Sequence, residues 1–482
     1  MNINYISRNI GLALVLNAAF MFLSVIVSLC YGRDAAFSPL LLSAVVTLAV
    51  GAFPLLFVRR GGAVTIKEGF FTIISTWFLV SVFGAFPYLL WGDDFTPINA
   101  WFESVSGYTT TGSTILDDIE SLPHSLLFWR SSTHYIGGLG VVVFMVLILP
   151  NYRNVFGLRL SGVEMTSLSK ENYKFKVSET AKIILSVYVA LTLLQTLLLT
   201  IAGVGFFDAL NHSMSISATG GFSTRNASAA AFQSPVVEVI MIFFMYVASL
   251  HFGLIYLTFA KRSSKIYKDP VFRFYTIMLV VSIIFTTTNL LIEDVEDNFL
   301  TALRHSAFMN ISAASSTGFA TTEAQGWPVF SLMILFYFSY QGACSGSTTG
   351  GLKADRMCVW FSSLRARLKR QLHSNAVVMP RFGNKLIDKE VVSDINLFIV
   401  FYILVIFIGA MCLSTTGLDL QQSLTTSLAC VGNTGLTFGS LSSFGSYNAF
   451  PAVSKLIFTI EMFLGRLEIY PILAFIVIRR WR

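Results

Sequence analysis

Charged residues are scarce in this chain. Asp, Glu, Lys and Arg make up 12% of its 482 residues, whereas soluble domains carry about 25%. Basic residues outnumber acidic ones by 33 to 26, so the formal net charge is only +7. The low charge excludes an ordinary water-soluble protein, and the modest basic excess gives little support to a nucleic-acid partner.

Cysteine is also sparse and shows no CxxC spacing. Disulfide and zinc chemistry are therefore not expected, and the thiols are interpreted as inert. The apolar segments lack paired carboxylates, a nucleophile triad and a metal cluster, so we expect neither an enzyme nor a bound organic cofactor. The histidines His134, His212 and His305 are interpreted as core or interface residues. The five cysteines are Cys30, Cys344, Cys358, Cys412 and Cys430.

Apolar sequence is abundant instead. Apolar residues make up 54% of the chain, and the mean hydropathy is +0.69. Because about 20 apolar residues cross a bilayer, these values predict many membrane spans. The first apolar run, 10–29, is followed by no small-residue cleavage site, so we interpret it as a retained helix rather than a signal peptide.

A short polar motif built on a Thr-Gly pair appears four times, each time between strongly apolar segments. The copies follow one another at similar intervals, which predicts four repeats with one loop each. Four such loops in a membrane protein indicate a pore with fourfold pseudosymmetry. The copies are Thr110-Thr111-Gly112, Ala218-Thr219-Gly220, Ser316-Thr317-Gly318 and Asn433-Thr434-Gly435.

Each repeat is expected to contain a span, a half-span, the loop and a second span. The half-spans are too short to cross, and irregular backbone at membrane depth must be buried in protein or line water. We therefore predict re-entrant pore helices. The three segments are 68–91, 97–110 and 125–150 in the first repeat, 180–204, 206–218 and 233–260 in the second, 272–292, 300–316 and 327–372 in the third, and 392–413, 419–432 and 450–478 in the fourth.

The predicted fold class is an all-α polytopic membrane protein. Four span–pore helix–filter loop–span repeats surround a central pore, and a hairpin of two helices, at 10–30 and 38–58, precedes them. The predicted boundaries are 1–64 for the hairpin and 65–152, 153–262, 263–375 and 376–482 for the four repeats.

Lysine and arginine gather on one side of this arrangement, which the positive-inside rule makes cytoplasmic together with both termini. The four loops lie on the opposite, acidic side, where a negative vestibule would concentrate cations; alternatively, acidic residues are merely excluded from the cytoplasmic loops by chance. The basic residues are Arg59, Arg60, Lys67, Arg153, Arg159, Lys170, Lys174, Lys176, Lys261, Arg262, Lys265, Lys268, the cluster within Lys353–Lys389, Arg479, Arg480 and Arg482. The acidic residues are Asp93, Asp94, Asp117, Asp118, Glu120, Glu293, Asp294, Glu296 and Asp297.

The residue types of the four loops suit cation permeation. A permeating cation exchanges its hydration shell for fixed oxygens, as it does at the carbonyl rings of potassium channels. Glycine permits the φ values that turn carbonyls inward, threonine adds a hydroxyl on a stiff stem, and each pore helix aims its partial negative charge at the ion. The four loops are therefore predicted to form one cation-binding filter.

With these motifs the chain resembles the potassium-translocating subunits of the Trk/Ktr/HKT superfamily over essentially its whole length, and most of all the TrkH/TrkG branch. The resemblance implies potassium uptake across the bacterial cytoplasmic membrane, with K⁺ as the transported ion bound at the twelve motif residues. The loops keep only the Thr-Gly core of the TVGYG pattern of potassium channels. The filter glycines implied are Gly112, Gly220, Gly318 and Gly435.

The same resemblance has further implications. The glycine at position 112 favours potassium, because a serine there accompanies sodium transport in related plant transporters. The family also implies a homodimer in the lipid membrane, controlled by a separate cytosolic ring subunit of the TrkA type that binds nucleotides.

A glycine-rich stretch, 342–353, interrupts the second span of the third repeat. So many glycines cannot hold a regular helix. A nucleotide-binding P-loop is disfavoured, because Leu352 follows Gly351 where that motif needs lysine and no strand precedes it. The alternatives are a passive kink or, as the family implies, an intramembrane loop that gates the pore below the filter. The gate residues would be Gly342, Gly346, Gly350, Gly351 and Lys353.

Arg466 lies inside the apolar run 456–478. Charges at that depth are costly and tend to mark ion paths. Glu461 and Glu468 are candidate partners for a purely structural ion pair. In the family the matching arginine faces the pore beneath the filter, which implies that Arg466 repels cations there and belongs to the gate.

A second functional hypothesis comes from another class. Ion-coupled secondary transporters also use repeats and broken helices, so a potassium symporter driven by protons or sodium is the alternative to a gated, channel-like pore. Single-channel current steps would favour the pore, and saturating, proton-coupled flux without steps would favour the symporter.

Overall fold

The structure is a computed structural model that describes residues 2–59, 66–148, 177–260, 265–373, 378–383, 385–437 and 443–468. Within these ranges the regular secondary structure is helical apart from one small hairpin, β1 (Arg381–Phe382) paired with β2 (Lys385–Leu386), and an isolated bridge between Gln341 and Leu352. The described residues include six helices long and apolar enough to cross a membrane, or seven if one bent pair counts as a single span. The predicted all-α polytopic fold is confirmed.

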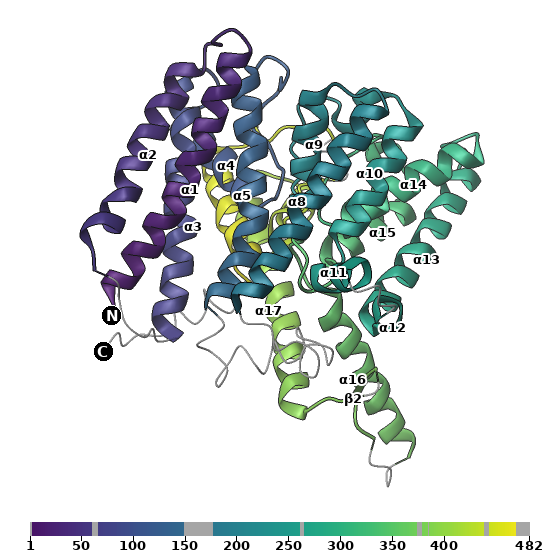
Figure 1. Cartoon of the computed structure of the whole chain (residues 1–482). Coiled ribbons are helices and arrows are strands. Elements are labelled where there is room, and N and C mark those ends of the chain that lie inside the picture. Colours follow the sequence, from purple (N-terminus) through teal and green to yellow (C-terminus); the bar gives the residue numbers. More distant parts are fainter. Residues whose placement is uncertain are drawn as a thin grey trace.

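An N-terminal hairpin of α1 (Ile3–Cys30) and α2 (Phe37–Phe57) lies at one edge of the molecule (Figure 1). The Asn2 side chain caps α1 by accepting a hydrogen bond from the Tyr5 amide. The two helices approach closely where each carries a glycine, because a Cβ at Gly11 would overlap the carbonyl oxygen of Gly51. Small residues that bring two backbones together are typical of helix pairs in membranes.

Four repeats follow the hairpin, and each contains one short helix between the helices that flank it. The short helices are α4 (Pro97–Tyr108), α9 (Phe206–Ala218), α14 (Phe299–Ala314) and α18 (Leu420–Gly432). The flanking helices are α3 (Ile66–Trp91) and α5 (His124–Ile148), α8 (Val177–Ile201), α10 (Pro235–Ala248) and α11 (Phe252–Ala260), α13 (Pro270–Ile292), α15 (Val329–Tyr340) and α16 (Ala354–Leu372), and α17 (Lys389–Ser414) and α19 (Ala452–Arg466). Connecting turns are η2 (Ser228–Phe232), α12 (Lys265–Lys268) and η3 (Ala324–Gly326).

Local sequence explains where the short helices begin. Thr96 and Asn298 cap α4 and α14 with their side chains, and Asp419 caps α18 by accepting from the Gln422 amide. In α9 the cap residue is Gly205, and Asp208 lies in the first turn, where a negative charge favours a helix start. The longest of these helices has 16 residues, which at about 1.5 Å per residue cannot cross the roughly 30 Å hydrocarbon core.

The second span of the second repeat is broken, although its hydropathy predicted one helix over 233–260. The axes of α10 and α11 meet at 106° around the break at 249–251. The glycine-rich segment of the third repeat forms hydrogen bonds with backbone groups that the break leaves without a partner in their own helix. The Cys344 amide donates to the Ser249 carbonyl at 3.2 Å, and the Phe252 amide donates to the Gly346 carbonyl at 3.2 Å. The break therefore depends on a partner distant in sequence.

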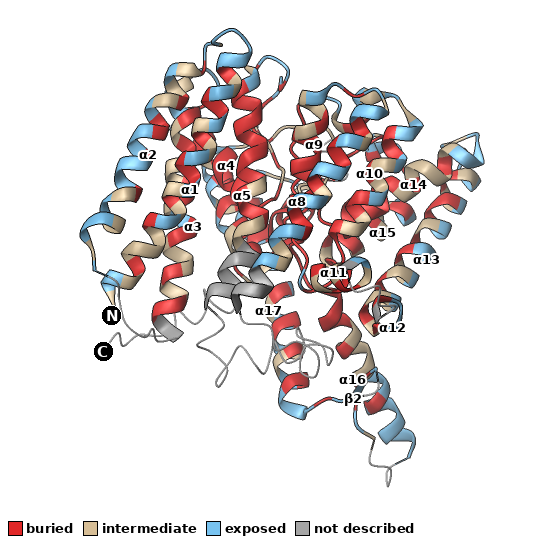
Figure 2. Ribbon diagram, viewed as in Figure 1, coloured by how far each residue is buried: buried red, intermediate tan, exposed pale blue. Residues whose placement is uncertain are grey.

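Apolar side chains cover the outside of the spans as well as filling the core. Many large apolar side chains point outward along the spans, as at Leu193, Phe243 and Phe407, and Figure 2 shows buried residues concentrated towards the centre. The short helices are buried there with polar side chains such as Ser213 and Ser427. An apolar rim around a polar centre suits a protein surrounded by lipid.

Parts of the predicted arrangement lie outside the described residues. These are the end of the last predicted span, 469–478, and the basic residues Arg60, Arg153, Arg159, Lys170, Lys174, Lys176, Lys261, Arg262, Arg479, Arg480 and Arg482. The boundaries between the repeats stay a prediction.

Candidate functional site: a ring of four loops and the segment beneath it

Each short helix ends in a left-handed residue followed, two positions later, by a glycine with positive φ. The first positions are Thr110, Thr219, Ser316 and Asn433, with φ of 53°, 55°, 49° and 50°. The glycines, which we call the ring glycines, are Gly112, Gly221, Gly318 and Gly435, with φ of 85°, 91°, 80° and 61°. Glycine adopts this conformation without steric cost, so the four loops (110–114, 219–223, 316–320 and 433–437) share one backbone path.

This geometry corrects the predicted register of the second loop by one residue. Gly221, not Gly220, is equivalent to Gly112, and Ala218 is the last residue of helix α9. The hydrogen bonds agree: the amide before each ring glycine donates to a carbonyl five residues back, from Thr111 to Ser106, Gly220 to Ser215, Thr317 to Ser312 and Thr434 to Ala429, at 2.9–3.0 Å. Aligning the loops on Thr/Ser/Asn-x-Gly, rather than on Thr-Gly, would have found this register from the sequence.

The four loops close into a ring in chain order. A Cβ added at any ring glycine would overlap a backbone carbonyl oxygen of the next loop, so the loops touch backbone to backbone. The contacts run from Gly112 to the Gly220 carbonyl, from Gly221 to the Thr317 carbonyl, from Gly318 to the Thr434 carbonyl and from Gly435 to the Thr111 carbonyl. The last contact joins the fourth repeat to the first and completes the circle.

Side-chain oxygens accompany the carbonyls. The Thr111 hydroxyl lies 2.9 Å from that of Thr109 and accepts a hydrogen bond from the side-chain amide of Asn433 at 3.0 Å. The hydroxyls of Ser315 and Thr317 are 2.7 Å apart. None of the twelve predicted filter residues carries a charge. A ring of neutral oxygens can replace the hydration shell of a monovalent cation.

The glycine-rich segment lies directly against this ring. Its Gly350 amide donates to the Ser316 hydroxyl at 3.0 Å, and its Thr348 hydroxyl donates to the Ser217 carbonyl at 3.0 Å. A Cβ at Gly350 would overlap Asn433. The segment thus contacts the bases of the second, third and fourth loops, and its backbone folds on itself where Gly342 packs against the Gly350 carbonyl.

Arg466 binds this segment rather than an acidic partner. It is buried, with 4% of its surface exposed, and its guanidinium donates to the Thr348 carbonyl at 2.7 Å and to the Gly137 carbonyl of α5 at 3.1 Å. Of its candidate partners, Glu461 accepts from the Ser427 hydroxyl at 2.5 Å, and Glu468 pairs with Arg356 at 2.6 Å. Within the described residues Arg466 therefore makes no ion pair. Lys353, the other predicted gate cation, donates to the Thr349 carbonyl.

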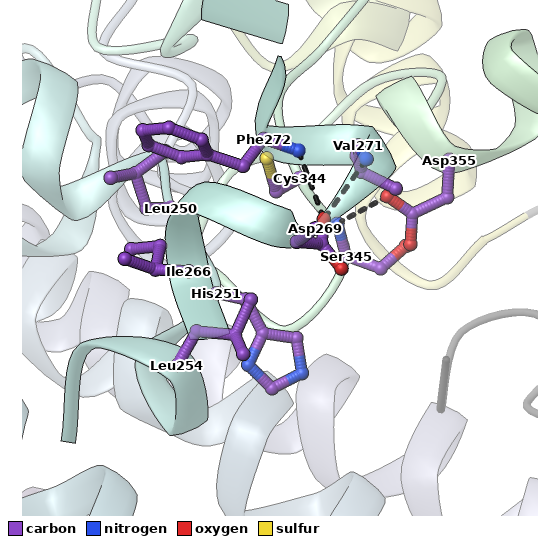
Figure 3. A pocket seen from close by; sticks show the side chains of 10 residues that line it. All are labelled: Leu250, His251, Leu254, Ile266, Asp269, Val271, Phe272, Cys344, Ser345 and Asp355. Carbon is purple, nitrogen blue, oxygen red and sulfur yellow. Dashed lines mark hydrogen bonds between the residues drawn. The ribbon is translucent and has the colours of Figure 1, made fainter. Parts of the chain in front are cut away.

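The break between α10 and α11 forms a second junction with the segment, which the sequence did not predict. Figure 3 shows a small cavity there, where His251, Asp269, Ser345 and Asp355 lie near one another. A Cβ at Gly346, whose φ is +78°, would overlap the His251 ring. Asp269 caps α13 through its bonds to two amides, and Asp355 accepts from the Ser345 amide at 3.5 Å. Two broken spans therefore brace each other beneath the ring.

Among the described residues, helix α16 carries an exposed basic surface. Helix α16 projects from the body on the side where α1 begins (Figure 1), and it exposes Arg365, Arg367, Lys369 and Arg370. The Arg370 guanidinium donates to the Val378 carbonyl at 2.7 Å, so it also binds the backbone shortly before β1.

Three comparisons with known proteins agree. The model of the TrkH family, described as cation transport proteins, matches residues 40–480. The Trk system potassium uptake protein TrkH of Salmonella typhimurium is 34% identical over the full length of both chains, and TrkG of Escherichia coli is 33% identical over 86% of this chain and 85% of its own. The crystal structure of the potassium transporter TrkH from Vibrio parahaemolyticus superposes with a TM-score of 0.91 at 30% identity, covering all of both chains.

Proposed function

The chain belongs to the TrkH family of cation transport proteins, and from that premise we propose that it takes up potassium across the cytoplasmic membrane of a bacterium through the ring of four loops. The function is transport rather than catalysis, in keeping with the names of its relatives. The observation that carries the proposal is the closed ring itself. One loop cannot surround an ion, whereas four loops in mutual contact can.

The proposed filter consists of the residues from each left-handed position to its ring glycine. Backbone carbonyls and threonine hydroxyls would supply the oxygens, and the four short helices would direct the negative ends of their dipoles towards the ion. Gly220 keeps a place in this proposal as the counterpart of Thr111, and Gly221 takes the place of ring glycine.

The proposed gate is the segment 342–353 together with Arg466. The segment contacts three of the four loops and would block the path sterically, as an element with two arrangements. The buried guanidinium of Arg466 would add an electrostatic barrier, since a fixed charge repels cations more strongly in a poorly solvated passage than in water.

The proposed assembly follows the family expectation. The chain would form a homodimer with both termini in the cytoplasm. A nucleotide-binding ring subunit would dock on the cytoplasmic side, where the exposed basic residues of α16 offer a charged surface.

The test is ion flux into liposomes that contain the purified protein. We expect potassium flux well above that of empty liposomes, and current steps in planar bilayers. Flux without steps that follows an imposed proton gradient would favour the symporter alternative, and the absence of potassium flux would contradict the proposal.

The Gly112→Ser variant tests the filter against a matched control. Gly92→Ser is the control, because Gly92 has nearly the same φ, 87° against 85°, and no neighbour within 4 Å of an added Cβ. Gly112→Ser should lower the ratio of potassium to sodium flux, whereas Gly92→Ser should leave the ratio unchanged. Equal ratios in both variants would remove Gly112 from the filter.

A further inference from the structure

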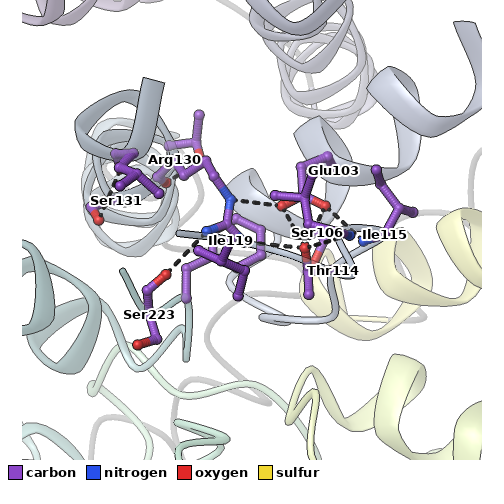
Figure 4. A network of polar contacts seen from close by, with 12 residues as sticks. Glu103, Ser106, Thr114, Ile115, Ile119, Arg130, Ser131 and Ser223 are labelled. Carbon is purple, nitrogen blue, oxygen red and sulfur yellow. Dashed lines mark hydrogen bonds and ion pairs between the residues drawn. The ribbon is translucent and has the colours of Figure 1, made fainter. Parts of the chain in front are cut away.

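A fully buried ion pair lies behind the first two loops. Glu103 of the short helix α4 and Arg130 of α5 have 0% and 1% of their side chains exposed, and the Arg130 Nε lies 2.8 Å from the Glu103 carboxylate (Figure 4). Removing two charges from water is costly and is often not repaid in stability. The pair is therefore a candidate for a role in the site it adjoins.

Glu103 holds the first loop. Its carboxylate accepts from the Thr114 hydroxyl at 3.0 and 3.1 Å and from the Ile115 amide at 3.0 Å. Thr114 and Ile115 directly follow the part of the loop that contains Gly112. The far end of the first loop is therefore tied to its own short helix by charge-assisted hydrogen bonds.

Arg130 joins the first loop to the second. Its guanidinium donates to the Thr114 hydroxyl at 3.2 Å and to the Ser223 carbonyl at 3.1 Å, and it lies 4.2 Å from the centre of the Phe222 ring. One helical turn further along α5, His134 stacks on the same ring at 4.1 Å. Residues four apart share a helix face, so α5 contacts the second loop through two side chains that lie one helical turn apart, Arg130 and His134.

The first three repeats differ at the equivalent position. Counted back by the same number of residues from the ring glycine, Glu103 corresponds to His212 in the second repeat and to Met309 in the third. His212 lies 2.9 Å from the Ser223 hydroxyl, which is the counterpart of Thr114. In the third repeat the equivalent pair is Met309 and Ala320, whose side chains cannot form this bond. Hydrogen bonds between polar side chains therefore hold the first two loops, and the third loop has apolar side chains at these positions.

We propose that Glu103 and Arg130 are positioning residues that fix the spacing between the first and second loops and thereby set the preference of the ring for potassium over sodium. The inference rests on the proposed function. A site discriminates between ions only if its oxygens stay where the preferred ion needs them. We call the Glu103–Arg130 pair the clamp. Without the clamp the two loops can move towards a smaller ion, and discrimination between potassium and sodium falls.

The experiment compares neutral double variants. A single substitution leaves one buried charge uncompensated and can prevent folding, so Glu103→Gln and Arg130→Gln are combined. The matched control combines Glu238→Gln and Arg304→Gln, because that ion pair has the same 2.8 Å distance and, within the described residues, bonds to none of the four loops. The readouts are melting temperature, KM and maximal rate for potassium, and the ratio of potassium to sodium flux in liposomes.

We expect the clamp variant to lower the flux ratio about tenfold, through increased sodium flux and a raised KM for potassium. The control should keep the wild-type ratio even if its melting temperature falls, since a purely structural loss scales both fluxes alike. Thr114→Val, which removes the hydroxyl that both side chains hold, should lower the ratio by a smaller factor and replaces the double variant if the latter does not fold.

Two results separate the possible failures. A transporting wild type with unchanged flux ratios in the clamp variant, or in Thr114→Val where that replaces it, overturns this inference alone. A wild type that carries no potassium overturns the proposed function and this inference with it.

Discussion

At the residue scale, two independent constraints act on each ring glycine. The backbone is left-handed, and the space that a Cβ would occupy is filled by the neighbouring loop. A left-handed conformation alone costs an ordinary residue about 1–3 kcal/mol and leaves the fold intact at many surface turns. The overlap with a neighbouring carbonyl cannot be relieved without moving a second loop, so its effect reaches the ring.

Substitution of Gly221 tests the corrected register of the second loop. We expect Gly221→Ala to lower potassium flux by about tenfold or more, because the added methyl group displaces the Thr317 carbonyl. Gly203→Ala is the control, since Gly203 has a similar φ of +97° and an open surrounding. Flux per folded protein in liposomes is the measurement. If Gly221→Ala transports as well as the control, Gly221 is not part of the ion path.

Substitution of Arg466 separates its charge from its hydrogen bonds. Arg466→Ala should raise basal potassium flux, with an effect that shrinks at high ionic strength if water reaches the site. Arg466→Lys keeps the charge but cannot reproduce the paired bonds to the Thr348 and Gly137 carbonyls. An electrostatic barrier therefore predicts flux near wild type for Arg466→Lys, and a mechanical anchor predicts that both variants are leaky. Flux at or below wild type in Arg466→Ala would remove Arg466 from the gate.

At the scale of elements, the sequence predicted what depends on local pattern. The short helices were found within a few residues because length and polar content separate them from spans. The break at 249–251 was missed because the run is predominantly apolar, in spite of Ser249 and His251, and the groups that stabilise the break, at Cys344 and Gly346, belong to another repeat. The second loop was misaligned because Gly220 and Gly221 are adjacent and the copies were aligned on the Thr-Gly pair rather than on the Thr/Ser/Asn-x-Gly spacing.

Residues that act behind the ring were harder to find. Glu103 and Arg130 are single charges in different helices, and no spacing in the sequence relates them. His134 and His212 were interpreted as core or interface residues, and both are buried; the structure adds that each contacts a loop. The sequence thus predicted which loops form the candidate site, but not which side chains hold those loops in place.

Helix α16 offers a test of docking that spares the fold. Neutralising Arg365, Arg367 and Lys369 with glutamine should weaken co-purification of the proposed nucleotide-binding subunit, because exposed charges steer and orient association. Arg370 is left intact because it holds the Val378 carbonyl. The control carries Lys182→Gln and Lys268→Gln, two exposed lysines on other helices. Undiminished co-purification of the triple variant would place the docking surface elsewhere.

At the scale of the whole molecule, the loops above the ring also link repeats that are distant in sequence. The Tyr447 amide donates to the Thr114 carbonyl at 2.7 Å, and the Ile119 amide donates to the Asn226 side chain at 2.6 Å. The first repeat is thereby tied to the fourth and to the second. Asp117 adds to the closure between the first and fourth repeats by accepting from Asn448 at 2.7 Å and from Ser446.

These links predict a dependence of stability on pH. Hydrogen bonds from Ser446 and Asn448 lower the pKa of Asp117 below its ordinary value of 3.8. A lowered pKa stabilises the folded protein above that ordinary value, and the contribution is lost as pH falls through the native pKa. At pH 6 the wild type should therefore have a higher melting temperature than Asp117→Asn. We expect a difference of only about 1–2 °C, because Asp117 is mostly exposed and exposed charges contribute little to stability.

The difference between the two melting temperatures should shrink towards zero as the pH is lowered below 3.8 and through the native pKa of Asp117. The measurement is a melting curve in detergent at several pH values, with Asp93→Asn as a control for an exposed aspartate in another loop. A constant difference across this range would show that Asp117 contributes through its shape rather than its charge.

The ring is built from one chain, and this has a consequence for how it can change over generations. In a channel of four identical subunits, one altered codon appears in all four quadrants at once. Here a codon alters only one of the four loops or its supporting helices. Selection can therefore keep a buried ion pair behind the first loop, a histidine behind the second and apolar side chains behind the third. Each quadrant is constrained mainly by its two neighbours, and the aperture can drift away from fourfold symmetry while it continues to close.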